Sequence, residues 1–329
     1  MPTDCAPGWA LAIHGGAGVI RRADLRSEQE QAYREALARA AEAGSAILGS
    51  GGPALDACEA AVRRMEDDPL FNAGRGSVFS AEGRVEMDAA IMEGRGLRAG
   101  AVAGVSTAKN PVSLARAVME RSGHVFLIGA GAEAFAREAG LEAAGADYFF
   151  TERRWRALER ELGKAGLPTP PRPTGDRDDR TAALAHDEGK RGTVGAVARD
   201  AGGDLAAASS TGGTTGKRWG RVGDTPLIGA GVYASNRGCA VAATGAGEYF
   251  IRLAVAKEIC ALVEHRGLGL QQAVDAVVQG ELAAIGGDGG VIAVAADGAL
   301  AWSFNTEGMH RASVGQTQPL RVAIYGDEA

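Results

Sequence analysis

The strongest constraint on the fold comes from short strand-like runs that are apolar at nearly every position. Three of them are "TVGAVAR" at 193–199, "LAAASS" at 205–210 and "CAVAAT" at 239–244. A strand that is apolar on both faces has to be covered on both faces. Amphipathic helical segments would supply the outer cover. The order of strand-like and helical segments along the chain predicts an α+β fold, with two sheets packed together and helix layers outside. With 49 glycines and only 5% aromatic residues, the layers should be thin and tightly stacked.

The other elements follow from the same periodicities. A hairpin is predicted over 291–304, because Asp297-Gly298 near its centre is a favoured two-residue turn. Further strands are expected at 9–14, 124–128 and 320–325, with a short strand pair at "GSVFS" and "GRVEMD". Helices are expected at 27–48, 54–67, 111–121, 131–139, 152–163, 248–266 and 269–284.

The composition changes at about residues 163–192, where four of the chain's eleven prolines stand among many charged residues. No apolar periodicity runs through this segment, which predicts a mobile linker. A structureless stretch of this length inside a compact protein calls for an explanation. Directly after it, a strand begins abruptly at Thr193.

Thr193 has an ordinary interpretation, because threonine is a good strand residue. The preceding linker favours another one. If the Gly192–Thr193 bond were cut, Thr193 would carry a free α-amino group, which titrates near about 8 in model compounds. That amine could accept the proton of the residue's own hydroxyl at neutral pH, with no histidine needed. The pattern predicts a threonine that is both nucleophile and base, released at the end of the linker.

The overall composition argues against several classes of partner and location. A net charge of −6 disfavours nucleic acid or an anionic membrane as the main partner. The four cysteines are scattered singly, which indicates neither a disulfide framework nor a zinc site. The N-terminal stretch lacks the basic segment of a signal peptide. No apolar run approaches the roughly 20 residues of a membrane span. We therefore expect a cytoplasmic protein with no membrane partner.

Three glycine-rich motifs suggest other chemistries, and each is incomplete. "HGGAG" at 14–18 is similar to the oxyanion loop of α/β-hydrolases, but no G-x-S-x-G occurs. "GAGAEA" at 129–134 partly matches a dinucleotide fingerprint, without a well-placed ribose acid. "TGGTTGKR" at 211–218 has Thr211 and Arg218 where a phosphate-binding loop needs Gly and Ser or Thr. The five histidines show no metal-binding spacing.

Seven motifs stand along nearly the whole chain: "FNAGRGSVF", "AGAVAGVSTAKNP", "GTVGAV", "STGG", "GRVGDTPLIGAG", "TGAGE" and "FNTEGM". Together and in this order they resemble the plant-type L-asparaginase/isoaspartyl peptidase family of N-terminal nucleophile hydrolases. The resemblance implies a four-layer αββα sandwich and autocatalytic cleavage at Gly192–Thr193. An α-subunit segment 1–192, with the linker, and a β-subunit 193–329 would form one compact domain. Two such pairs would assemble into a heterotetramer.

The resemblance also implies the catalytic groups. Thr193 would be the nucleophile, and Thr211 would hydrogen-bond to it and orient it. The Thr244 hydroxyl and the Gly245 amide would form the oxyanion hole. Two fixed donors suit this role, because amide hydrolysis develops negative charge on the carbonyl oxygen. No cofactor is implied for catalysis.

Substrate binding follows from the same resemblance. Arg221 would bind the α-carboxylate, since its planar guanidinium suits paired hydrogen bonds, and Asp224 would bind the α-ammonium. The substrates would be L-asparagine and β-aspartyl (isoaspartyl) dipeptides, which share this head group. The loop "KRWG" places Arg218 and Trp219 just before Arg221, where a bulky aromatic could change the balance between the two substrates.

A structural sodium ion is also implied, bound by backbone carbonyls of one loop, as oxygen ligands suit hard cations. The carbonyls are those of Met65, Glu66, Asp68, Phe71, Ala73 and Arg75.

Two alternative functions stay open at this point. A glycosylasparaginase-like amidohydrolase would use the same machinery, although glycosylasparaginases usually have Asp before the nucleophile, where this chain has Gly192. A non-enzymatic nucleotide-binding protein would use the glycine-rich loops instead.

Overall fold

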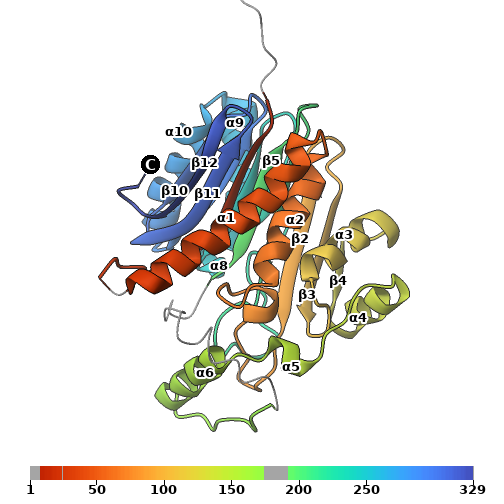
Figure 1. Ribbon diagram of the computed structural model, residues 1–329, viewed down its shortest axis with the longest axis vertical. Coiled ribbons are helices and arrows are strands. Elements are labelled where there is room, and N and C mark those ends of the chain that lie inside the picture. Colours follow the sequence, from red (N-terminus) through yellow and green to blue (C-terminus); the bar gives the residue numbers. More distant parts are fainter. Residues whose placement is uncertain (1–7, 24, 174–191, 329) are drawn as a thin grey trace, which may run out of the picture.

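Two sheets form the centre of the molecule in the computed structural model, which describes residues 8–23, 25–173 and 192–328 (Figure 1). The larger sheet holds, in spatial order, β12 (Gln318–Tyr325), β11 (Gly308–Gly315), β1 (Ala10–Gly18), β5 (Val194–Arg199), β6 (Leu205–Thr211), β2 (Met87–Glu93), β3 (Ala99–Val105) and β4 (Phe126–Ile128). The smaller holds β10 (Leu300–Phe304), β9 (Gly289–Ala295), β8 (Cys239–Gly245) and β7 (Val232–Ala234). All neighbouring strands run antiparallel except β3 and β4.

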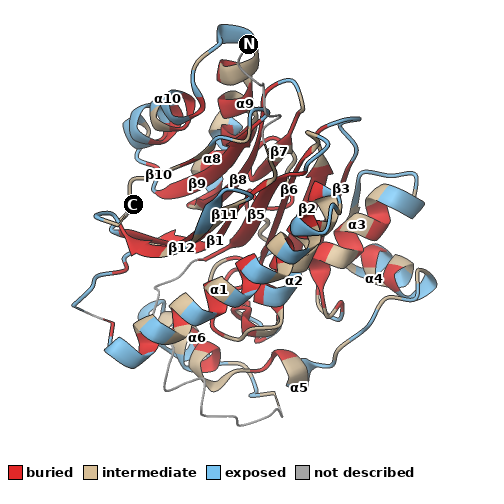
Figure 2. Cartoon of the chain, turned by 45° about the horizontal axis from the view of Figure 1, so that its top comes forward, coloured by how far each residue is buried: buried red, intermediate tan, exposed pale blue. Residues whose placement is uncertain are grey.

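The two sheets pack face to face, and helices cover their outer faces (Figure 2). Small side chains such as Ala12, Ala207 and Ala242 form the buried layer between the sheets. The larger sheet is covered by α1 (Ser27–Gly49), α2 (Ala54–Glu66) and α3 (Pro111–Arg121). The smaller is covered by α9 (Val255–Arg266), α10 (Leu270–Asp275) and a π-helical turn, Ala276–Leu282. The predicted α+β class is confirmed.

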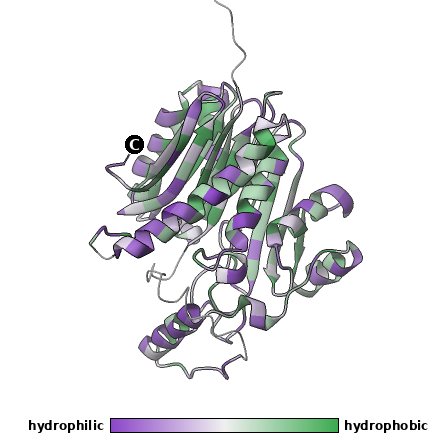
Figure 3. Ribbon diagram, viewed as in Figure 1, coloured by the Kyte–Doolittle hydropathy of each residue, from purple (hydrophilic) through white to green (hydrophobic). Residues whose placement is uncertain are grey.

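The central strands are apolar on both faces because both faces are covered. Every residue of β5 and β6 is buried, and Figure 3 shows the hydrophobic strands enclosed between helices with hydrophilic outer surfaces. Small residues allow this close stacking. A Cβ on Gly44 of α1 would lie 2.8 Å from the Leu11 side chain and 2.9 Å from the Ala57 carbonyl oxygen. No larger residue fits between these layers without displacing one of them.

Two strand predictions were wrong. "GSVFS" and the first part of "GRVEMD" form only an isolated bridge between Phe79 and Val85, while Met87 and Asp88 at the end of "GRVEMD" begin β2, which pairs with β3. Strands β3, β7 and β11 were missed altogether. Several of these strands carry Ala and Gly, whose intrinsic strand preference is low. Pairing with β6, β1 and one another makes β2, β3 and β11 strands.

The predicted helix 248–266 is interrupted. Ala254 adopts a left-handed conformation with φ 50° and separates α8 (Gly247–Leu253) from α9. The reason lies in the loop packed against the start of α9. The amides of Ala256 and Lys257 donate to the carbonyls of Ala230 and Gly229, which satisfies donors that a helix N-terminus leaves unpaired. The predicted helix 269–284 is continuous, with α10 passing into a π-helical segment, Ala276–Leu282.

Shorter elements complete the chain. They are a 3₁₀ turn (Gly74–Gly76), α4 (Gly129–Glu138), α5 (Ala146–Phe149) and α6 (Glu152–Lys164). Most of the predicted linker, residues 174–191, lies outside the described residues. In the part of the chain that the structure describes, no helix is long and apolar enough to cross a bilayer.

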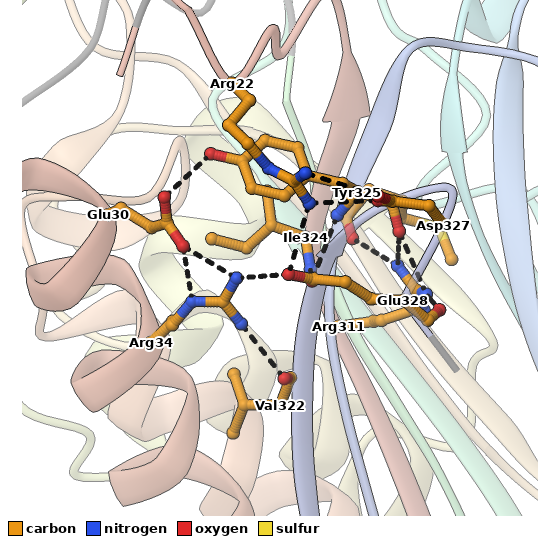
Figure 4. A network of polar contacts seen from close by, with 10 residues as sticks. Arg22, Glu30, Arg34, Arg311, Val322, Ile324, Tyr325, Asp327 and Glu328 are labelled. Atoms are coloured by element: carbon orange, nitrogen blue, oxygen red, sulfur yellow. Dashed lines mark hydrogen bonds and ion pairs between the residues drawn. The ribbon is translucent and has the colours of Figure 1, made fainter. Parts of the chain in front are cut away.

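A polar network joins the C-terminal edge strand to α1 (Figure 4). Arg34 of α1 bonds to the Val322 carbonyl and to the carboxylates of Glu30 and Glu328. The Tyr325 hydroxyl also donates to Glu30. These bonds fix β12 at the sheet margin.

The cysteines that looked scattered include one close pair. Cys239 on β8 and Cys260 on α9 are both buried free thiols, and their sulfur atoms are 3.1 Å apart in a hydrogen bond rather than a disulfide.

Candidate active site

One pocket collects most of the predicted catalytic and substrate-binding residues. Its lining includes Gly192, Thr193, Thr211, Arg221, Asp224 and Gly245. Antiparallel pairing explains how Thr193 and Thr211 meet. Val194 at the start of β5 pairs with Ser210 at the end of β6, so the residues just outside this pair lie at the same sheet end. Thr193 and Thr211 are 6% and 2% exposed, so their hydroxyls face protein rather than bulk water.

The Thr211 hydroxyl has its hydrogen-bonding capacity filled by groups of the site. It donates to the Gly192 carbonyl oxygen at 2.8 Å. It accepts the Thr193 hydroxyl at 3.4 Å and the Gly213 amide at 2.9 Å. A hydroxyl has one donor and two acceptor positions, so all three are used. The predicted contact between Thr193 and Thr211 is therefore present, and Thr211 also contacts the carbonyl before Thr193.

Asn72 is a site residue to which the sequence assigned no role. Its side-chain amide donates to the Gly192 carbonyl oxygen at 2.9 Å and to the Gly213 carbonyl oxygen at 2.8 Å. Its side-chain oxygen accepts the Val78 amide, which sets the direction of the donors. The Gly192 carbonyl thus accepts two hydrogen bonds, from Asn72 and Thr211. The only signal in the sequence was its position inside "FNAGRGSVF".

His14 holds the other side of Thr193. Its Nδ1 lies 3.0 Å from the Thr193 carbonyl oxygen. A carbonyl only accepts, so Nδ1 carries the hydrogen in this contact. Burial lowers the pKa of His14 to about 3, more than its bond to Thr193 raises it. His14 is therefore neutral and positions the backbone of Thr193.

Arg221 and Asp224 face the pocket from one loop. Arg221 donates through two nitrogens to the Glu248 carboxylate, at 2.9 and 3.1 Å. Asp224 is 3% exposed, and its Oδ2 has no hydrogen-bond partner among the described residues. Burial raises the pKa of Asp224 to about 7. The unpartnered, buried Oδ2 of Asp224 lies beside Arg221. This arrangement suits a ligand that carries a positively charged group to pair with Asp224.

Thr244 and Gly245 stand at the end of β8. Gly245 lines the pocket. This position requires glycine for two reasons: its φ is 156°, and a Cβ atom added to it would lie only 2.3 Å from the Asp288 carbonyl oxygen. Thr244 is fully buried and is not among the lining residues. Its hydroxyl accepts the Ala17 amide at 3.4 Å, from the "HGGAG" segment. Among the described residues the Thr244 hydroxyl accepts this bond and donates none, so its proton can be donated to a ligand.

Two buried ionisable side chains, Asp88 and Lys217, lie near Thr211. Asp88 of β2 pairs in register with Thr211 and is fully buried, and burial raises its pKa. Burial lowers the pKa of Lys217, whose ammonium donates to the Glu86 carbonyl at 2.6 Å. Neither residue was singled out from the sequence, and neither lines the pocket.

The loop predicted to hold sodium is the one that carries Asn72, and it folds back on itself. A Cβ on Gly74 would lie 2.3 Å from the Glu66 carbonyl oxygen, and one on Gly76 would lie 1.9 Å from the Phe71 carbonyl oxygen. These carbonyls therefore lie against the Gly74–Gly76 turn. The carbonyls of Met65, Asp68 and Ala73 each accept a backbone amide of the same loop.

Comparison with known proteins gives a match over nearly the whole chain. The sequence profile of the family described as "Asparaginase" matches residues 7–324. The isoaspartyl peptidase of Salmonella typhimurium is 49% identical, covering 92% of this chain and 94% of that protein. That of Escherichia coli is also 49% identical, over 92% and 91%. The plant-type L-asparaginase of Pyrococcus abyssi is 42% identical, over 91% and 94%.

Proposed function

The chain belongs to the asparaginase family, and from this premise we propose that it is a threonine hydrolase acting on β-aspartyl amides. It hydrolyses L-asparagine to L-aspartate and ammonia, and it cleaves β-aspartyl dipeptides. One observation carries the proposal: Thr193 shares one pocket with Thr211, Arg221 and Asp224. The direct test is release of ammonia from asparagine, and of a free amino acid from β-aspartyl dipeptides, by the purified protein.

Family membership decides between the alternatives. The relatives at 49% identity are named isoaspartyl peptidases, which favours β-aspartyl dipeptides over glycosylated asparagine. The nucleotide-binding alternative is set aside, because the loop 211–218 contributes Thr211 and Thr214 to the pocket that contains Thr193. The two packed sheets with outer helices fit the four-layer αββα sandwich of N-terminal nucleophile hydrolases, and we assign the fold to that type.

Self-cleavage precedes catalysis in this proposal. In the uncleaved chain the Thr193 nitrogen is an amide and cannot act as a base. Thr211 accepts from the Thr193 hydroxyl and donates to the Gly192 carbonyl, so it can pass a proton from one to the other during attack. The Thr193 oxygen bonds to the Gly192 carbonyl carbon, the C–N bond breaks, and the nitrogen gains a proton. Water then hydrolyses the ester, which frees the Gly192 carboxylate and the Thr193 amine and hydroxyl.

The released amine then serves as the base for the substrate reaction. It takes the Thr193 hydroxyl proton as the oxygen attacks the side-chain carbonyl of the substrate. The Thr244 hydroxyl and the Gly245 amide stabilise the oxyanion, with each donor contributing about 3 kcal/mol to the transition state. Ammonia or an amino acid leaves with the proton. Water then hydrolyses the aspartyl ester and restores Thr193.

The head group of the substrate replaces contacts that are already in place. The α-carboxylate takes the position of the Glu248 carboxylate on Arg221, with the same paired geometry. The α-ammonium meets the Asp224 carboxylate. This exchange places the side-chain amide toward Thr193.

The raised pKa of Asp224 predicts a pH-dependent KM. Below about pH 7 the Asp224 carboxyl of the free enzyme takes up a proton and loses the charge that attracts the α-ammonium. KM for asparagine should therefore rise, by up to about tenfold per pH unit below that value. Measurement of KM and kcat from about pH 5.5 to 8.5 tests this, because protonation of the Thr193 amine in the complex acts on kcat instead. A KM that stays constant across this range would contradict the assignment of Asp224.

Replacing Arg221 by Lys should separate substrate binding from self-cleavage. Lysine keeps the charge but loses the paired donors, so kcat/KM for asparagine should fall about 100-fold, equivalent to roughly 2–3 kcal/mol. Self-cleavage should survive, since the Gly192–Thr193 bond carries no α-carboxylate. The cleaved fraction on a gel and the initial rate of ammonia release are measured on one preparation. A cleaved variant with the wild-type rate at subsaturating asparagine would show that Arg221 is not the carboxylate ligand.

We also propose that the carbonyls of Met65, Glu66, Asp68, Phe71, Ala73 and Arg75 bind a structural sodium ion. The support is that the Glu66 and Phe71 carbonyl oxygens lie against the same turn, Gly74–Gly76. The melting temperature should be higher in sodium chloride than in choline chloride at equal ionic strength. Equal melting temperatures would remove the proposal.

The quaternary structure and location follow the family resemblance. We propose that two α and two β chains form the mature heterotetramer. The division at residue 192, the single compact domain and the cytoplasmic setting stay predictions.

A further inference from the structure

Trp219 is the most exposed of the large apolar side chains in the described part of the chain, at 88%. Single exposed apolar residues are common on protein surfaces and need no special explanation. Trp219 differs from them in its backbone and in its location, and these two observations are independent of its exposure.

The backbone at Trp219 is unfavourable for tryptophan. The Arg221 amide donates to the Arg218 carbonyl at 3.1 Å and closes a four-residue turn. Its two central residues, Trp219 and Gly220, have φ of 59° and 69°. A turn with positive φ at both central residues favours Asn-Gly, and a bulky residue there costs about 1 kcal/mol or more. Neither burial nor backbone preference accounts for a tryptophan at this position.

The turn stands at the rim of the active-site pocket. Thr214 and Arg221, on either side of it, both line the pocket. Between them, the Gly216 amide and the Lys217 carbonyl bond to Phe79 and Ala81, which fixes the base of the loop. Residues 218–220 are all exposed. The loop therefore leaves the pocket wall at Thr214, rises into solvent, and returns to the wall at Arg221.

Arg218 and Trp219 form one unit at this rim. The Arg218 guanidinium carbon lies 4.2 Å from the centre of the Trp219 ring, within cation–π distance. Stacking on the ring limits the freedom of an otherwise flexible cation. The pair presents a positive charge and a flat apolar surface side by side. An amino acid with a free carboxylate and an apolar side chain is complementary to both.

We propose that Arg218 and Trp219 form a subsite for the leaving amino acid of β-aspartyl dipeptides, with a preference for apolar and aromatic leaving residues. Arg218 binds the C-terminal carboxylate, and the Trp219 ring packs against the side chain. Asparagine releases only ammonia and cannot use this subsite. The proposal rests on the proposed function and names the substrate class that the same site selects.

The test compares the kcat/KM of β-L-aspartyl-L-phenylalanine with that of L-asparagine. Trp219→Asn is the informative variant, because Asn suits this turn and removes only the ring. The ratio of the two values should fall about tenfold, mainly through KM of the dipeptide, and Trp219→Tyr should restore most of it. Ile128→Asn, which removes another exposed apolar side chain on β4, is the matched control and should keep the wild-type ratio.

The Arg218 contact has its own probe. Arg218→Ala should weaken cleavage of β-L-aspartyl-L-phenylalanine several-fold more than that of its C-terminal amide, which lacks the carboxylate. An unchanged ratio of the two kcat/KM values in Trp219→Asn would overturn the subsite. If both substrates lose kcat/KM equally and size exclusion shows a changed oligomeric state, Trp219 has a structural or interface role instead. Failure of the wild-type protein to hydrolyse either substrate would refute the proposed function itself, so the two failures are distinguishable.

Discussion

Thr193→Ala should leave the chain uncut and inactive. The variant keeps the backbone and loses only the hydroxyl that attacks the Gly192 carbonyl carbon and, after cleavage, the substrate. Denaturing mass spectrometry should show one chain of full length. The wild type should give one chain that ends at Gly192 and another that begins "TVGAV". Ammonia release from asparagine should fall by at least about 10⁴-fold, as expected when a nucleophile is removed.

Thr193→Ser is the matched control, because serine keeps the hydroxyl and loses only a methyl group. It should cleave itself and retain measurable activity. An uncut wild-type chain with full asparaginase activity would rule out the N-terminal threonine mechanism, whatever the variants do.

Asn72→Ala should slow self-cleavage by about 10²–10³-fold. Negative charge develops on the Gly192 carbonyl oxygen during attack, and that atom accepts hydrogen bonds from only two described donors, Asn72 and Thr211. Loss of one such donor commonly costs this factor. The measurement is the time course of the uncut fraction on a denaturing gel, from freshly purified precursor.

Asn72 also joins two loops, so a structural effect has to be separated from a catalytic one. Asn305 offers the comparison: its amide donates to the Gly287 carbonyl and its oxygen accepts the Gly289 amide. Like Asn72, the Asn305 side chain connects two backbone groups, but neither of these bonds involves Gly192. Asn305→Ala should lower the melting temperature and still cleave itself promptly. If both variants delay cleavage equally at matched melting temperatures, the oxyanion role of Asn72 is wrong.

The core strands were predictable because their signal is local. "TVGAVAR" and "CAVAAT" carry small apolar residues at positions of both parities, and the structure buries both faces of β5 and β8. Strands β2 and β3 were not predictable in this way. "MDAAIME" and "AGAVAGV" carry no signal that sets them apart from their surroundings, and they are strands through the pairing of β2 with the distant β6 and of β3 with β2. The break at Ala254 likewise depends on carbonyls of the Gly229–Ala230 loop.

The sequence by itself determined the chemistry that needs only covalent neighbours. A threonine after a glycine at the end of a linker can become nucleophile and base in one residue, and no tertiary contact is needed to see that. Only the tertiary structure decided which groups face the Gly192 carbonyl. Asn72 reaches it across 120 residues of sequence, through a register that sequence spacing does not encode. The structure alone also decided the pKa of Asp224, because the ionisation of a carboxyl depends on how much protein surrounds it.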